Sequence, residues 1–139
     1  MKLYAHPFSS YCQKVLIALY ENATPSECRL LAGDDALAAE HEKLWPLRRM
    51  PVLVDGDRVV VEASIIVEHL DLHHPGPVRL LPADAKRALP VRTLDRFFDN
   101  YVMTPMQKIV FDALRTPETR DPHAVAQAKA QLDTSYRWL

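Results

Sequence analysis

The first half of the chain alternates between two hydrophobic patterns, one typical of strands and the other typical of helices. Short apolar runs predict strands, and apolar residues three or four positions apart predict helices. In chain order the sequence predicts a strand at 2–5, a helix at 10–20, a strand at 27–31, a helix at 35–44, strands at 51–55 and 58–61, and a helix around 65–70. This order, β-α-β-α-β-β-α, indicates a small sheet covered by helices.

The second half of the chain shows only helical patterns. Prolines and a glycine at 75–77 end the last helix of the first half and predict a linker. The predicted elements that follow are a long helix at 87–114, which Pro90 and Pro105 interrupt, a polar loop at 116–122 and a helix at 123–139. We therefore expect an α/β domain at 1–74, a linker at 75–85 and a helical domain at 86–139, and we expect this helical domain to be incomplete.

Composition narrows the possible functions. The 139 residues carry a formal net charge of -1, which gives no electrostatic reason to expect nucleic acid or an anionic membrane as a partner. Two cysteines do not make a disulfide framework, so a reducing compartment, the cytoplasm, is the prediction. The N-terminus shows no signal-peptide pattern, no membrane span is predicted, and three glycines leave no glycine-rich phosphate loop.

The strand-to-helix junction at 7–15 is the most informative part of the sequence. Ser9, Ser10 and Cys12 lie where the first predicted strand leads into the first predicted helix. Unpaired N–H groups and the positive end of the helix dipole favour an anion at such a junction, including a thiolate. Thiol–disulfide enzymes place Cys-x-x-Cys there, whereas Ser9 puts a hydroxyl at the first position. A hydroxyl cannot exchange disulfides, but it can donate a hydrogen bond to the thiolate of a ligand.

The sequence leaves the roles of these side chains open. Ser10 and Gln13 match a capping box, which makes Ser10 the predicted N-cap residue. Ser10 is the alternative thiolate donor if the helix starts one residue earlier, and Ser9 is either the thiolate donor or a simple turn residue. Cys12 is expected to be a partly buried small apolar side chain, and the alternative is a mixed disulfide with a thiol ligand. Cys28, in the second strand, is expected to lie in the core.

Several motifs together resemble the glutathione transferase family. They are the Ser-x-x-Cys helix start, Met50-Pro51-Val52 before a hairpin, Glu62-Ala63-Ser64 at a helix start, and the helical second half. The resemblance implies a thioredoxin-like α/β N-terminal domain that binds glutathione, followed by an all-α C-terminal domain that shapes the site for a second substrate. It also implies a homodimer and the conjugation of glutathione to a small electrophile, a detoxification reaction.

The resemblance assigns roles to residues around the glutathione. Ser9 matches the serine that donates a hydrogen bond to the glutathione sulfur. Met50 and Pro51 match a cis peptide whose backbone, at Met50, pairs with the cysteinyl part of the tripeptide. Arg49 suits the glycyl carboxylate, and Glu62 suits the γ-glutamyl ammonium group.

Ala63 departs from the family pattern. Relatives usually have a serine there, whose hydroxyl and N–H bind the γ-glutamyl carboxylate. Ala63 keeps the N–H and lacks the hydroxyl, and Ser64 is a partial substitute. Phe8, Tyr101, Met103 and Met106 are the candidates for a second-substrate pocket.

Two further hypotheses remain beside the transferase. The first is a binding or regulatory protein of the same fold with little catalysis, and the second is a thiol transferase that depends on Cys12. Histidines at 69, 73 and 74 suggest a metal site, and His69 and His73 have the i,i+4 spacing. Because no third type of ligand converges on them in the sequence, and because helix C-termini favour histidine, we predict no metal site.

Overall fold

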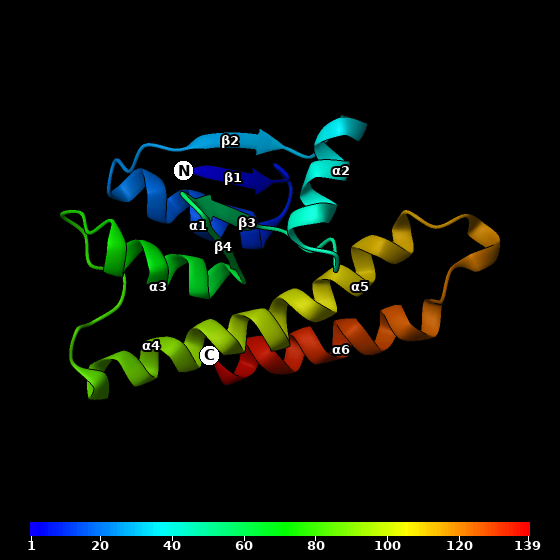
Figure 1. Ribbon diagram of the computed structural model, residues 1–139. Helices are drawn as coiled ribbons and strands as arrows, with labels where there is room; N and C mark the ends of the chain where they lie inside the picture. The colour runs from blue at the N-terminus through cyan, green and yellow to red at the C-terminus, as the bar shows by residue number, and fades with distance from the viewer. The chain divides into compact units, whose positions relative to one another are not determined.

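The computed structural model describes residues 1–139 and consists of two compact units, Met1–Pro82 and Ala83–Leu139 (Figure 1). The boundary between them falls inside the segment 75–85. None of the helices is both long enough and apolar enough to cross a membrane.

The first unit has the predicted thioredoxin-like order of strands and helices. Its elements are β1 (Lys2–Ala5), α1 (Ser10–Glu21), β2 (Glu27–Leu30), α2 (Asp35–Leu44), β3 (Val52–Asp55), β4 (Arg58–Val61) and α3 (Ala63–His73). The sequence prediction is confirmed for every element, with boundaries that differ by up to three residues, the largest difference being at the C-terminal end of α3.

The four strands form one sheet in the order β2-β1-β3-β4. The central strand β3 is antiparallel to both of its neighbours, and in this register Tyr4 pairs with Val52 and Val52 pairs with Val61. The carboxyl ends of β1 and β4 therefore lie beside the amino end of β3. The loops that continue from these three ends meet at one edge of the sheet.

Alternating side chains give the sheet two apolar faces. On one face, Leu3 and Leu53 pack with Val15 of α1 and Ile66 of α3, and all four side chains are fully buried. The opposite face is smaller: Tyr4 and Val52 pack there with Leu37 of α2. The sheet is thus covered on both faces, as the α/β pattern predicted.

Tyr4 also ties the smaller core to α2 through a polar contact. Its hydroxyl donates a 2.6 Å hydrogen bond to Oε1 of Glu40. Burial and the neighbouring Glu40 carboxylate raise the pKa of Tyr4 to about 12, so the hydroxyl stays protonated at neutral pH.

Cys28 is the one predicted core residue of a strand that the structure contradicts. It is exposed, and so are most side chains of β2. The reason is that β2 is an edge strand, paired only with β1, so a residue there has neighbours on fewer sides.

The second unit is helical. Its elements are α4 (Ala85–Phe97), the π-helical segment η1 (Phe98–Met103), α5 (Thr104–Ala113), the short 3-10 turn η2 (Pro117–Thr119) and α6 (Pro122–Trp138). Figure 1 shows α6 running back alongside α5. The predicted long helix is thus one helical run whose middle part is π-helical: the N–H of Thr104 donates to the carbonyl of Asp99, five residues back.

Pro105 leaves the carbonyl of Tyr101, in η1, without an α-helical backbone donor, and a side chain of α6 hydrogen-bonds to this carbonyl. A proline has no N–H, so Pro105 cannot donate to the carbonyl of Tyr101, four residues earlier. The hydroxyl of Ser135, buried in α6, lies 2.8 Å from this carbonyl and 2.9 Å from the carbonyl of Gln131, and it shares its one hydrogen between them. The contact fixes α6 against η1 at the point where the regular α-helical pattern is lost.

Candidate functional site

The sheet register brings three predicted site segments of the first unit to the same edge. Residues 6–10 follow β1, residues 49–51 precede β3, and residues 62–64 follow β4. Tyr4, Val52 and Val61 lie side by side in the sheet. Each of the three segments begins or ends one or two residues from this row. They are the elements from which a candidate glutathione site is built.

Ser9 is the N-cap residue of α1. Its backbone is extended (φ -85, ψ 117), and its Oγ accepts a 3.4 Å hydrogen bond from the N–H of Cys12. Its carbonyl accepts the N–H of Gln13 at 2.9 Å, the first bond of the helix. An accepting hydroxyl keeps its own hydrogen for donation. Ser9 thus caps the helix and can still donate to a ligand atom in front of it.

The predicted capping box at Ser10 is wrong. Ser10 is the first helical residue, and its Oγ is buried without a hydrogen-bond partner. The side-chain amide of Gln13 donates to the carbonyl of Pro7 at 2.8 Å and does not reach back to an N-cap residue. The helix begins one residue earlier than a capping box at Ser10 requires, which moves the cap to Ser9.

Cys12 lies in the core rather than at the surface. Its side chain is fully buried, and its Sγ accepts the N–H of His6 at 3.4 Å. Burial raises the pKa of the Cys12 thiol, and hydrogen bonds with Ser9 and the backbone of His6 oppose this only in part. A buried, protonated thiol is a poor nucleophile, so the geometry matches the small apolar role.

The predicted cis peptide between Met50 and Pro51 is confirmed. Arg49, the residue before this peptide, is held in place by α2, because the Nε2–H of His41 donates a 3.0 Å hydrogen bond to the carbonyl of Arg49. His41 is buried beside Tyr4. Sequence reasoning missed it, although it follows the buried Leu37 by four residues on the same helix face.

The two arginines of this loop have different surroundings. Arg48, with a positive φ of 53, makes a 2.6 Å ion pair with Glu42. Arg49 is exposed. Of the two, Arg49 is therefore the better candidate for a ligand carboxylate.

The start of α3 has an unusual backbone. Glu62, its N-cap residue, has φ 69 and makes no capping hydrogen bond with its side chain. A positive φ is strained for a residue other than glycine, and such residues are concentrated at functional sites. Ala63 is buried, whereas Glu62 is exposed and Ser64 is half-buried.

Lys14 adds a positive charge at the start of α3, which sequence reasoning did not single out. Its Nζ donates to Oγ of Ser64 at 3.3 Å, from one turn into α1. A lysine ammonium at the positive end of a helix favours a carboxylate. One signal in the sequence pointed to Lys14: it follows Ser10 by four residues, about one helical turn, and so lies on the same side of α1.

The candidates for a second-substrate pocket lie in separate units. Phe8 is almost fully exposed in the first unit. Tyr101 lines a groove of the second unit between α4, η1 and α6, and neither Met103 nor Met106 lines it. A second-substrate pocket made by these four residues stays a prediction.

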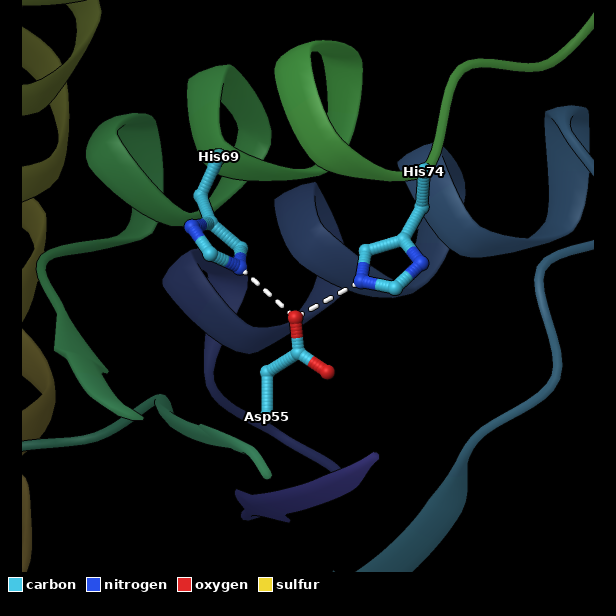
Figure 2. A group of neighbouring side chains, drawn as sticks. All are labelled: Asp55, His69 and His74. Carbon is cyan, nitrogen blue, oxygen red and sulfur yellow. Dashed lines mark hydrogen bonds and ion pairs between the residues drawn. The ribbon is translucent and has the colours of Figure 1, made fainter. Parts of the chain in front are cut away.

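The structure brings a carboxylate, Asp55, to two of the three histidines, a contact that the sequence did not predict. Oδ2 of Asp55 accepts hydrogen bonds from Nε2 of His69 at 2.9 Å and of His74 at 2.6 Å (Figure 2). These bonds, the one from His74 first, lower the pKa of the Asp55 carboxyl to about 2. The pair that converges is His69 with His74, not His69 with His73 as the i,i+4 spacing suggested.

Comparisons with known proteins agree with this architecture. The family model "Glutathione S-transferase, N-terminal domain" matches residues 3–78. Glutathione S-transferase Z2 of Arabidopsis thaliana is 38% identical over 93 residues, 64% of this chain and 41% of that protein. A probable maleylacetoacetate isomerase of Vibrio cholerae is 32% identical over 96 residues, 66% of this chain and 44% of that protein.

Among solved structures, a glutathione S-transferase from Methylobacillus flagellatus with GSH bound superposes with a TM-score of 0.85 at 25% identity. The superposition covers 98% of this chain and 66% of that one. The chain thus spans less than half of the curated relatives' length and about two thirds of this structure.

The assignment of the cap to Ser9 predicts opposite effects for two neighbouring alanine substitutions. Ser9→Ala removes the cap of α1 and should lower the free energy of unfolding by about 0.5–1 kcal/mol. Ser10→Ala removes a buried hydroxyl without a partner and should leave it unchanged or slightly higher. Urea denaturation of both variants measures the difference. A larger loss for Ser10→Ala would return the capping role to Ser10.

Proposed function

Because the chain belongs to the glutathione S-transferase family, we propose that its first unit binds glutathione at the sheet edge formed by residues 6–10, 49–51 and 62–64. The bound thiol gives its proton to water there, and the thiolate forms an S–C bond with an electron-poor carbon of a small electrophile as a leaving group departs or a double bond opens. Glutathione is a co-substrate in this proposal, and Ser9 is the residue that stabilises its sulfur.

The observation that carries the proposal is the position of Ser9. Its hydroxyl caps α1 as an acceptor, and its single hydrogen can turn from the Cys12 sulfur to the sulfur of a ligand, at the positive end of the helix. Lowering the pKa of a thiol from about 8.5 by two units requires about 2.7 kcal/mol. A hydrogen bond to a charged group contributes about 1.5–3 kcal/mol and a helix terminus about 0.3–1 kcal/mol. The two together are sufficient.

The remaining segments would hold the ends of the tripeptide. The backbone of Met50, next to the cis peptide to Pro51, would pair with the cysteinyl residue as an added strand does. Arg49, exposed and anchored through its carbonyl to His41, would bind the glycyl carboxylate.

The start of α3 would bind the γ-glutamyl end. The N–H groups of Ala63 and Ser64 open the helix without a side-chain cap, and the Lys14 ammonium lies beside them, which suits a carboxylate. Glu62 would pair with the γ-glutamyl ammonium group. Each polar end of the ligand thus meets a group of opposite charge.

Two kinds of electrophile are consistent with a thiolate at this site. One similar protein is named a probable maleylacetoacetate isomerase, and several are named transferases. Conjugation and isomerisation of a maleyl double bond can both begin with a thiolate adding to an activated carbon, so one thiolate site serves either. A homodimer, a cytoplasmic location and a role in detoxification belong to the same proposal.

Ala63 favours one alternative, a glutathione-binding protein with little catalysis. Without the serine hydroxyl that the family pattern places there, one hydrogen bond to the γ-glutamyl carboxylate is absent, and binding is weaker by about 0.5–1.5 kcal/mol. The thiol-transferase hypothesis has less support, because the Cys12 thiol is buried and its pKa is raised.

The transferase proposal predicts a lowered thiol pKa for bound glutathione. Thiolate absorbance, measured against pH with protein in excess over glutathione, should rise at a lower pH than for free glutathione. Ser9→Ala should move this transition back by about one to two pH units and reduce conjugation of a chromogenic electrophile by about 10- to 100-fold. The physical reason is the loss of the donor to the sulfur.

Cys12→Ala is the matched control, since it removes the neighbouring sulfur and leaves the Ser9 hydroxyl in place. It should keep the thiol transition and the conjugation rate. Loss of activity in Cys12→Ala alone would show that the serine mechanism is wrong. Binding of glutathione without any shift of its thiol pKa would favour the binding protein.

Restoring the missing hydroxyl should strengthen binding. Ala63→Ser offers one more hydrogen bond to the γ-glutamyl carboxylate, so the affinity for glutathione should rise by about 2- to 12-fold. Calorimetric titration measures it, with Ala39→Ser on the exposed face of α2 as the control. An unchanged affinity in Ala63→Ser would place the γ-glutamyl carboxylate elsewhere.

A further inference from the structure

A second group of ionisable side chains lies at the opposite end of β3 from Pro51. Asp55 is the last residue of β3, His69 belongs to the C-terminal half of α3, and His74 is the C-cap residue of that helix. At 1.5 Å per residue, His74 is about 16 Å along the helix from Ala63. The group therefore belongs to the first unit but not to its candidate glutathione edge.

The three side chains point to a common centre. Figure 2 shows both imidazole rings turned toward one carboxylate oxygen. His69 and His74 place their Nε2 atoms 2.9 Å and 2.6 Å from Oδ2 of Asp55, and the three atoms all lie within 4.8 Å of one another. Since a carboxylate only accepts hydrogen bonds, both rings present an N–H to it when no ion is bound.

We infer that Asp55, His69 and His74 bind a divalent transition-metal ion, Zn²⁺ in particular. Two imidazole nitrogens and one carboxylate oxygen are a known ligand set for zinc with an open fourth position. Imidazole ligands suit zinc and its neighbours in the first transition row, whereas Mg²⁺ and Ca²⁺ prefer oxygen. The chemistry of the three donors therefore selects the class of ion.

The distances fit an ion between the three donors. With Zn–N and Zn–O bonds of about 2.0–2.2 Å, ligand atoms around a tetrahedral zinc ion are about 3.3 Å apart. The two nitrogen–oxygen separations, 2.9 Å and 2.6 Å, are shorter than this value, and all three atoms lie within 4.8 Å of one another, so an ion would enter by widening the two shorter separations. His74 lies beyond the last helical residue and its side chain is one third exposed, so it can adjust and leaves room for a water ligand.

His73 is not part of the group, although its ring is 4.5 Å from that of His69. Its Nε2 lies 3.3 Å from Nη1 of Arg58. An arginine only donates hydrogen bonds, so this nitrogen uses its lone pair to accept one. The guanidinium charge also opposes a cation there, which makes His73 a suitable control.

The bound ion would join the end of β3 to the end of α3. It replaces two hydrogen bonds by three coordinate bonds and so stabilises the folded first unit against the unfolded chain. This consequence does not depend on the proposed transferase function, because none of the three ligands belongs to the glutathione edge.

Calorimetric titration of the metal-free protein with zinc chloride tests the site. We expect one zinc ion per chain with a dissociation constant in the micromolar range or tighter, and a melting temperature that rises by several degrees with zinc. Asp55→Asn and His74→Gln should each weaken binding by more than about tenfold, since loss of even an outer-shell partner costs about 10- to 100-fold. Zinc should then no longer raise their melting temperature.

Two matched controls separate this site from other zinc ligands. His73→Gln removes the adjacent imidazole, and Cys28→Ser removes the exposed thiol; both should keep the wild-type affinity within about twofold. If Asp55→Asn does not fold, His74→Gln at the partly exposed helix end carries the test. Absence of zinc binding, an unchanged affinity in His74→Gln, or loss of binding in Cys28→Ser would each overturn the inference.

Discussion

The pairing of β3 with two antiparallel neighbours is the constraint on which the first unit depends. Because β1 and β4 both run opposite to β3, their carboxyl ends lie beside its amino end, in the row Tyr4, Val52 and Val61. A slip of one residue would also exchange the two faces of β3, moving Leu53 out of the larger core. The hydrophobic core thus fixes the register, and the register fixes the site.

From this register the two ends of β3 acquire different chemistry. At the amino end, helix N-termini, the Met50 backbone and Lys14 offer donors and positive charge, which suit an anionic, thiol-bearing ligand. At the carboxyl end, Asp55 gathers two histidines from the far end of α3. A strand of four residues therefore separates the proposed glutathione site from the proposed metal site.

Most of the fold was predictable from the sequence because the first unit follows regular periodicities. The strands, the helices and the cis peptide at Met50-Pro51 were recognised from apolar spacing and from the motif resemblance. The exposure of Cys28 was not, because strand order across the sheet, which makes β2 an edge, is absent from local patterns. The hydrogen bond from Ser135 to the carbonyl of Tyr101 in η1 was not predicted either, because these residues lie 34 positions apart in the chain.

The site was predictable in its segments and less so in the roles of single side chains. A shift of one residue in the helix start exchanged the roles of Ser9 and Ser10. The i,i+4 rule selected His73, whereas His74 leaves the helical path at the C-cap and turns to Asp55. Lys14 and His41 act across elements, through Ser64 and Arg49, and sequence spacing does not show such contacts.

Three chain segments meet at one edge of the sheet, and amide-resolved NMR with added glutathione shows whether a single ligand contacts all three. The largest shifts should occur together at the amides of Ser9 and Ser10, of Met50, and of Ala63 and Ser64. Shifts confined to one of these segments, or centred on the opposite end of β3 around Gly56, would contradict binding across all three segments.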